Sequence, residues 1–173
     1  MLRRDVKECH ENAVLKNFMV YLEARGVDVE LLCKPDPPDA VVKIDERKSW
    51  IEITDVFVDD KLAESITSGL ASDKPHKPVP KTSRFVVEPA QGFGEKLSES
   101  ISGKYGKMRN VYDTYGPGIL LVGIQTPFSS AECLSLNKLK KPENADSKIF
   151  SKIFYYDTSG SAFHEAHFLD GLP

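Results

Sequence analysis

The stretch PPDAVVKIDERKSWIEIT, residues 37–54, is the part of the sequence on which we base the fold. Two apolar segments flank a charged turn, a pattern that predicts a β-hairpin. Asp39 lies at the start of the first strand, and Glu52 lies inside the second strand between two isoleucines. Because burying an unpaired carboxylate is costly, an acid in an apolar strand needs a partner. A metal ion held by two or three acids would be one.

Length and composition indicate the broad class of protein. The chain has 173 residues, of which 28 % are charged and 40 % hydrophobic, and this predicts a single domain over residues 1–173. No apolar run approaches the roughly 18 residues of a membrane span, and the N-terminal residues are typical of a polar helix rather than a signal peptide. We therefore expect a cytoplasmic protein with no membrane partner.

The three cysteines, Cys9, Cys33 and Cys133, are scattered and show no CxxC spacing. This usage favours buried thiols in a reducing compartment over a disulfide framework or a zinc site. The four histidines have no nearby cysteine partner either, and we expect no histidine metal centre.

The net charge of −3 does not by itself indicate a nucleic-acid-binding protein. Basic residues nevertheless gather at residues 74–84, 96–109 and 138–141. Taken singly, each group is more typical of a solvated loop or helix face.

Hydrophobic spacing along the chain predicts an α/β fold. Spacings of three and four predict helices at residues 4–25 and 95–115, with shorter helices at 60–69 and 130–139. Strands are expected at residues 27–32, 40–44, 50–58, 84–87 and 148–156, a strand or short helix at 162–169, and a loop at 74–81. The apolar run at residues 119–124 predicts a fully buried central strand. This order predicts a mixed central sheet flanked by helices.

Glu11 belongs to the inward stripe of the first predicted helix. It precedes Val14, Leu15 and Phe18 by three, four and seven residues, so these side chains share one helix face. The simpler alternative is an acid favoured by the helix dipole in the first half of the helix.

The register of the hairpin decides which acids meet. Alternation along residues 50–58 places Glu52 and Thr54 on one face of the strand and Asp55 on the other. A turn centred near Arg47 would place Asp39 opposite Asp55, about three residues or roughly 10 Å from Glu52. Asp36 and Asp55 therefore remain substitutes for the acids named above.

A helix acid, an acid after proline at a strand start and a glutamate in the next strand together resemble the PD-(D/E)xK nuclease superfamily. The Pro-Asp pair ending at Asp39 matches the first half of that signature, and residues 51–54 match the second half except in the last position. Glu11 matches the acid that many members have on the preceding helix. The resemblance covers residues 8–57 by motif and reaches about residue 125 by element order, and it implies a restriction-endonuclease-like fold.

The resemblance implies hydrolysis of phosphodiester bonds in nucleic acid, with DNA favoured over RNA. Glu11, Asp39 and Glu52 would hold Mg²⁺ or Mn²⁺, which prefer oxygen ligands, and the basic groups at 74–84 and 138–141 would contact phosphates. A homodimer is compatible with the resemblance, because many such nucleases cut two strands in pairs.

The sequence departs from the family at the strand lysine, which is replaced by Thr54. A threonine hydroxyl can donate a hydrogen bond but has no charge. In some members the lysine has migrated to the helix before the central strand, and Lys104 or the nearby Lys107 matches that arrangement. Lys104 follows Ile101 by three residues and so borders the inward stripe. The alternative is a lysine that merely covers apolar surface.

A second function is compatible with the same residues. A nuclease-like fold without catalysis could bind nucleic acid or protein, and Thr54 and the mildly acidic charge favour this alternative. A third possibility is an acidic hairpin on an unrelated α/β protein, and it predicts that the carboxylates do not converge.

Overall fold

The computed structural model describes residues 2–57, 60–70, 73, 75–78, 89–125, 139–140, 148–157, 160–166 and 168–169. The helices are α1 (Arg3–Glu23), α2 (Asp60–Leu70), α3 (Pro89–Lys107) and α4 (Arg109–Tyr115). The strands are β1 (Val29–Cys33), β2 (Ala40–Ile44), β3 (Arg47–Phe57), β4 (Gly118–Gln125), β5 (Leu139–Lys140), β6 (Phe150–Asp157), β7 (Phe163–Glu165) and β8 (Phe168–Leu169).

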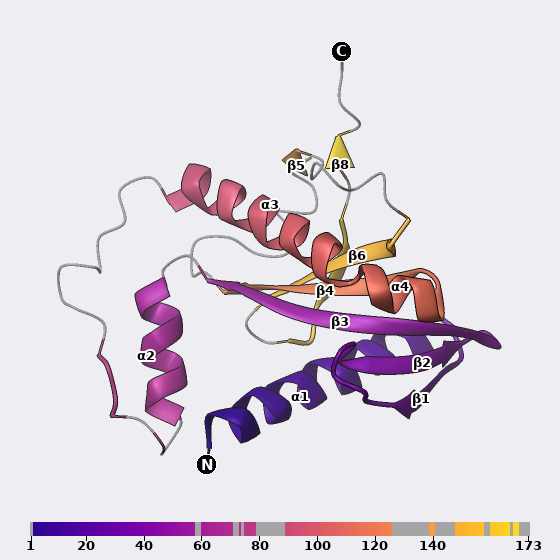
Figure 1. Cartoon of the computed structure of the whole chain (residues 1–173), viewed down its shortest axis with the longest axis horizontal. Coiled ribbons are helices and arrows are strands. Elements are labelled where there is room, and N and C mark those ends of the chain that lie inside the picture. Colours follow the sequence, from indigo (N-terminus) through magenta and orange to yellow (C-terminus); the bar gives the residue numbers. More distant parts are fainter. Residues whose placement is uncertain are drawn as a thin grey trace.

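Six of these strands form one mixed sheet in the order β1-β2-β3-β4-β6-β7 (Figure 1). The first three strands are an antiparallel meander, β3, β4 and β6 run parallel, and β7 pairs antiparallel with β6. β5 and β8 form a separate parallel pair. The sequence-based prediction of an α/β protein with a mixed sheet flanked by helices is confirmed.

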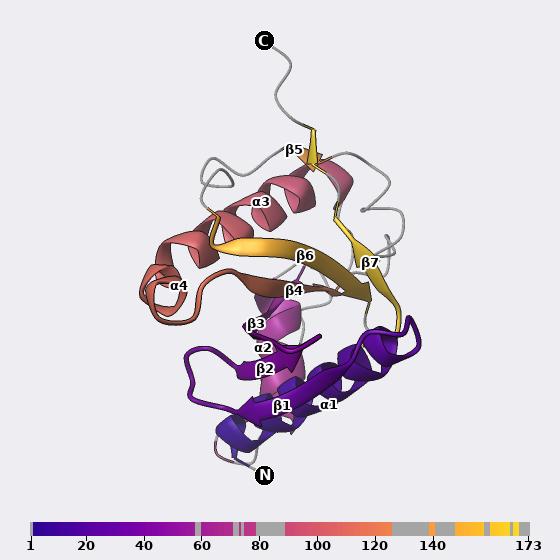
Figure 2. The ribbon, with the colours of Figure 1, turned by 90° about the vertical axis from the view of Figure 1, so that its right-hand side faces the viewer.

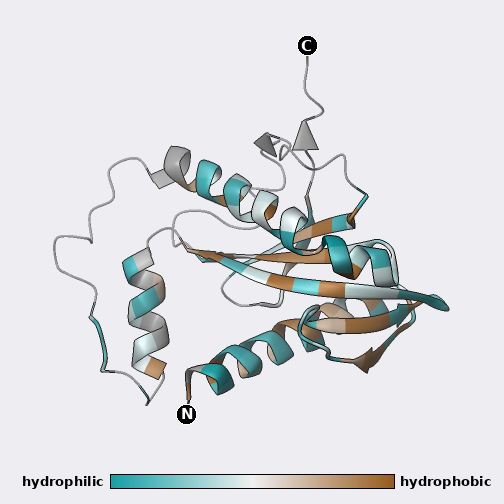
Figure 3. Cartoon of the chain, in the orientation of Figure 1, coloured by the Kyte–Doolittle hydropathy of each residue, from teal (hydrophilic) through white to brown (hydrophobic). Residues whose placement is uncertain are grey.

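Helices cover both faces of the sheet, with α3 and α4 on one face and α1 on the other (Figures 1 and 2). Strand β4 lies in the middle and is buried along almost its whole length, as its continuous apolar sequence predicts. Hydrophilic residues predominate along α1, whereas hydrophobic residues predominate along β2 and β4 (Figure 3).

Side-chain alternation on β3 divides the core into two clusters. Trp50 and Val56 pack with α3 and α4, whereas Ile51 and Ile53 pack with Phe18 and its neighbours on α1. This is the division that the period of two predicts. The same alternation directs Glu52 toward α3 and Asp55 toward α1, because each contacts a side chain from that helix.

The hairpin turn is tighter than the sequence suggested. Ile44 pairs with Arg47, so only Asp45 and Glu46 form the loop, and both have positive φ angles of 45° and 67°. Two-residue loops of this kind match the twist of the adjoining strands. The turn predicted near Arg47 was therefore wrong, and Arg47 is the first residue of β3.

Several other boundaries also differ from the predictions. The helix expected at residues 95–115 begins earlier and is interrupted at Met108 between α3 and α4. Cys9 and Cys33 are exposed free thiols, so the expectation of buried thiols was wrong for both; Cys133 lies outside the described residues. The strand expected at 84–87 and residues 130–138 of the expected short helix also lie outside them, and residue 139 belongs to β5.

Gly118 provides a test of the packing between β3 and β4. A Cβ atom at this position would lie 2.3 Å from the ring of Trp50, whose indole N–H donates to the carbonyl of Gly116 at 2.7 Å. We expect Gly118→Ala to lower the free energy of unfolding by about 1–3 kcal/mol, because the buried indole must shift. Urea denaturation measures the loss.

The matched control is Gly103→Ala in α3, where an added Cβ meets no atom within 4 Å. This variant should be neutral or more stable by up to about 1 kcal/mol, since alanine favours a helix. Equal effects of the two substitutions would contradict the packing argument.

Candidate active site

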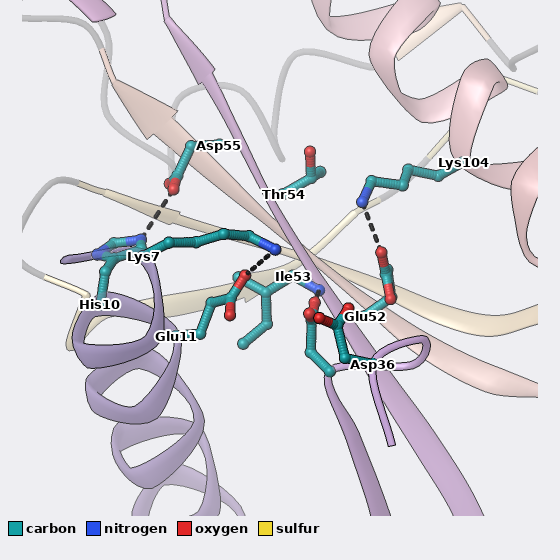
Figure 4. Close-up of a pocket in the computed structure, with 10 residues that line it drawn as sticks. Lys7, His10, Glu11, Asp36, Glu52, Ile53, Thr54, Asp55 and Lys104 are labelled. Carbon is teal, nitrogen blue, oxygen red and sulfur yellow. Dashed lines mark hydrogen bonds and ion pairs between the residues drawn. The ribbon is translucent and has the colours of Figure 1, made fainter. Parts of the chain in front are cut away.

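A pocket with a volume of about 220 Å³ gathers the acids that the sequence singled out. It lies beside the central part of β3, between α1 and α3 (Figure 4). The residues that line it are Lys7, His10, Glu11, Asp36, Asp39, Glu52, Ile53, Thr54, Asp55 and Lys104.

Asp39 and Glu52 are neighbours across the hairpin. Ala40 pairs with Ile51, so the same register carried one residue further places Asp39 opposite Glu52, where side chains of facing residues lie close together. The alternative register, with Asp39 opposite Asp55, does not occur, because the loop has two residues rather than a longer turn. The two carboxylates are buried, with exposed fractions of 6 % and 5 %.

Main-chain hydrogen bonding anchors Asp39. The backbone N–H of Ile53 donates to Oδ2 of Asp39 at 2.7 Å. Asp39 follows two cis peptide bonds, Asp36–Pro37 and Pro37–Pro38, and Asp36 itself is exposed at the edge of the same pocket. The proline segment is thus followed directly by Asp39, the first buried acid of the hairpin.

Lys104 reaches across from α3 to Glu52. Its Nζ lies 2.6 Å from Oε1 of Glu52, and the side chains are only 20 % and 6 % exposed (Figure 4). The second oxygen, Oε2, is buried and has no hydrogen-bond partner among the described residues. Burial and the neighbouring Asp39 carboxylate raise the pKa of Glu52 above its ordinary value, although Lys104 opposes this.

Glu11 faces the same carboxylates from α1. Burial and the charge of Asp39 raise its pKa above the ordinary value, while Lys7 opposes this shift through an ion pair of 3.1 Å one helical turn away. Glu11 thus lies within electrostatic reach of Asp39. Its carboxylate forms an ion pair with Lys7.

The described residues contain no set of three or more His, Cys, Asp or Glu side chains arranged to hold a metal ion as they stand. Asp39 and Glu52 come together, whereas Glu11 is tied to Lys7. The two lysines Lys7 and Lys104 therefore act as the counterions of this acidic pocket.

The remaining predicted residues differ in whether they line the pocket. Thr54 lines the pocket at the position where the family has its lysine, and Lys104 supplies the nearby ammonium group. Lys107 is exposed at the end of α3 and does not line the pocket. Of the basic residues expected to contact phosphates at 74–84 and 138–141, Lys140 lies in β5, and the Nζ of Lys77 pairs with Glu64 at 2.5 Å.

Sequence reasoning missed a second polar cluster, centred on Asp55. His10 Nε2 lies 2.8 Å from Oδ2 of Asp55, while Tyr156 and Gln125 donate to Oδ1 at 2.9 and 3.0 Å. Although burial opposes it, these hydrogen bonds lower the pKa of Asp55, and in turn Asp55 raises the pKa of His10. Both oxygens of Asp55 thus already have partners within the protein.

A signal for this cluster was present in the sequence. His10 precedes Val14 by four residues, and alternation already placed Asp55 on the face of β3 that packs on α1. What the sequence could not provide was the distance between the two elements. Gly123 leaves space for the cluster, because a Cβ there would lie 2.0 Å from Oδ1 of Asp55.

Comparisons of the chain with protein-family models, with curated proteins and with solved structures found no match. In the part of the chain that the structure describes, every helix is too short or too polar to cross a membrane. The assignment of function therefore depends on the pocket itself.

The raised pKa values of Glu11 and Glu52 predict how stability depends on pH in metal-free protein. Because the folded state binds these protons more tightly than the unfolded chain, their contribution to stability is present below the ordinary pKa of 4.5 and is lost as pH rises through the raised values. We expect Glu11→Gln to show a smaller fall in the urea midpoint than the unsubstituted protein between that pH and neutrality, measured in EDTA.

The control is Glu8→Gln, which removes an exposed acid from the same helix. Its pH profile should parallel that of the unsubstituted protein. A parallel profile for Glu11→Gln would show that Glu11 experiences no repulsion from the buried acids.

Proposed function

We propose that this protein is a metal-dependent nuclease of the PD-(D/E)xK type, which hydrolyses phosphodiester bonds in DNA. The observation that carries the proposal is the contact between Lys104 and Glu52, two residues that lie 2.6 Å apart although they come from different elements. It supplies a cationic side chain where Thr54 replaces the family's strand lysine.

The donor set fits Mg²⁺ or Mn²⁺. Mg²⁺ in phosphoryl-transfer sites is commonly held by one or two carboxylates plus water and substrate oxygens, and Asp39 with Glu52 offers two. Oε2 of Glu52, which is buried and has no hydrogen-bond partner among the described residues, would be available to a cation. Glu11 would be a third ligand once it leaves Lys7. A bound divalent cation would lower the pKa of a water molecule and offset phosphate charge.

The chain's own residues would divide the remaining tasks. Lys104 has its ammonium beside the acids, from which it can orient the attacking water or stabilise charge on the phosphate. Lys7 would be released to the substrate when Glu11 turns to the metal. Thr54 offers a hydroxyl as a hydrogen-bond donor on the Lys104 side of β3.

Glu52→Gln tests the metal site. The substitution keeps the shape of the side chain and removes its charge, so we expect cleavage of a DNA duplex in Mg²⁺ or Mn²⁺ to fall by about three orders of magnitude or more. Calorimetry should show a matching loss of Mg²⁺ binding, and circular dichroism should show a folded domain. Cleavage that survives in a folded Glu52→Gln protein would refute the assignment.

Lys104→Met tests the charged assistant. Because Lys104 is a donor and not a ligand, kcat should fall by about a hundredfold or more, while Mg²⁺ affinity stays the same or rises. Lys107→Met removes the same charge from an exposed position three residues away and should change kcat little. The opposite result would transfer the role to Lys107.

A second candidate function is a catalytically inactive nuclease-like fold that binds nucleic acid or protein. One observation favours it: among the described residues, no set of three acids is preassembled for a metal, and both lysines already neutralise carboxylates. This alternative predicts DNA binding that is equal in EDTA and in Mg²⁺, with no cleavage in either.

A further inference from the structure

The cluster around Asp55 has no task in the chemistry proposed above. Three side chains, from α1, β4 and β6, converge on the carboxylate of Asp55 in β3: His10, Gln125 and Tyr156. Apolar side chains would fill this part of the core without the cost of burying a charge. The arrangement therefore calls for an explanation in terms of the more exposed of its two members that line the pocket.

That member is His10. Its side chain is 40 % exposed, whereas that of Asp55 is 21 % exposed, and both residues line the pocket. A carboxylate only accepts hydrogen bonds, so the contact with Asp55 requires a hydrogen on Nε2 of His10. Among the described residues, the other ring nitrogen, Nδ1, has no hydrogen-bond partner.

The position of His10 complements that of Lys104. In the close-up, Glu52 with Lys104 and His10 with Asp55 lie on opposite sides, and the Lys7–Glu11 pair lies between them (Figure 4). A DNA strand that crosses the acids would meet Lys104 at one side and His10 at the other. Because Asp55 and the groups bonded to it hold the ring in place, a contact from His10 costs little additional ordering.

We propose that His10 is a substrate-contacting residue for the phosphate of DNA beside the cleaved bond. Its Nδ1 either donates to a phosphate oxygen, when it carries a hydrogen, or accepts from a water molecule that donates to that oxygen. This inference rests on the proposed function, since it assigns a contact for the same substrate. Asp55 is the positioning residue that fixes the ring through Nε2.

Two substitutions of His10 separate a substrate contact from a structural role. His10→Ala removes the ring entirely. His10→Gln places an amide near the position of Nε2, so it can still donate to Asp55 but offers nothing at Nδ1. If His10 contacts DNA, both variants should raise KM for a fluorescein-labelled DNA duplex about tenfold, with kcat and Mg²⁺ affinity nearly unchanged.

The matched control is Lys16→Ala, which removes an exposed cation from the same helix away from the pocket and should leave KM unchanged. A normal KM in His10→Ala, or a normal KM restored by His10→Gln, would overturn the inference, because the ring would then serve only the fold around Asp55. Either result would leave the proposed function intact if Glu52→Gln still abolishes cleavage.

The failure of the proposed function has a different signature, namely no cleavage by the unsubstituted protein in Mg²⁺ or Mn²⁺. In that case fluorescence anisotropy with the same duplex decides the role of His10. Affinity lost about tenfold in both His10 variants but retained in Lys16→Ala would support the contact. Equal affinity in all proteins, or no binding by any of them, would overturn it.

Discussion

One partly buried ion pair, between Lys104 and Glu52, links the two sides of the pocket and offsets the charge of its most deeply buried acid. A carboxylate inside a sheet is tolerated only when another group offsets its charge, and here that group comes from a helix on the far side of a core cluster. The pairing fixes α3 against β3 at a polar point within an otherwise apolar contact. The second oxygen of Glu52 has no hydrogen-bond partner in the part of the chain that the structure describes.

The hairpin could be predicted in outline but not in register. Alternating apolar residues defined both strands, and the faces of β3 followed directly from the period of two. The register depended on a loop of Asp45 and Glu46, neither of which is glycine or asparagine, although both adopt positive φ angles. Sequence offers no strong signal for such a turn. The sequence therefore left open whether Asp39 lies opposite Glu52 or opposite Asp55.

The site shows the same division between local pattern and distant contact. The resemblance pointed to Lys104, and the spacing of Lys104 from Ile101, which is a local property, placed it at the border of an inward helix stripe. The Lys7–Glu11 pair is an i, i+4 contact within α1 and follows the same local spacing, whereas the contact of His10 with Asp55 depends on how far α1 lies above the sheet. That distance is set by the volume of the core, including the small Gly123, and no spacing along the chain reveals it.

The pocket draws its charged groups from both faces of the sheet, with α1 on one side and α3 on the other (Figure 2). Neither the hairpin nor either helix contains a complete set. If the pocket hydrolyses DNA, a nascent chain would be inert until α3 has been synthesised and docked, long after α1 and the hairpin have emerged. Loss of α1 by local unfolding or proteolysis would likewise remove Glu11 and His10 together. Cleavage of the cell's own DNA would then be possible only for the fully folded chain.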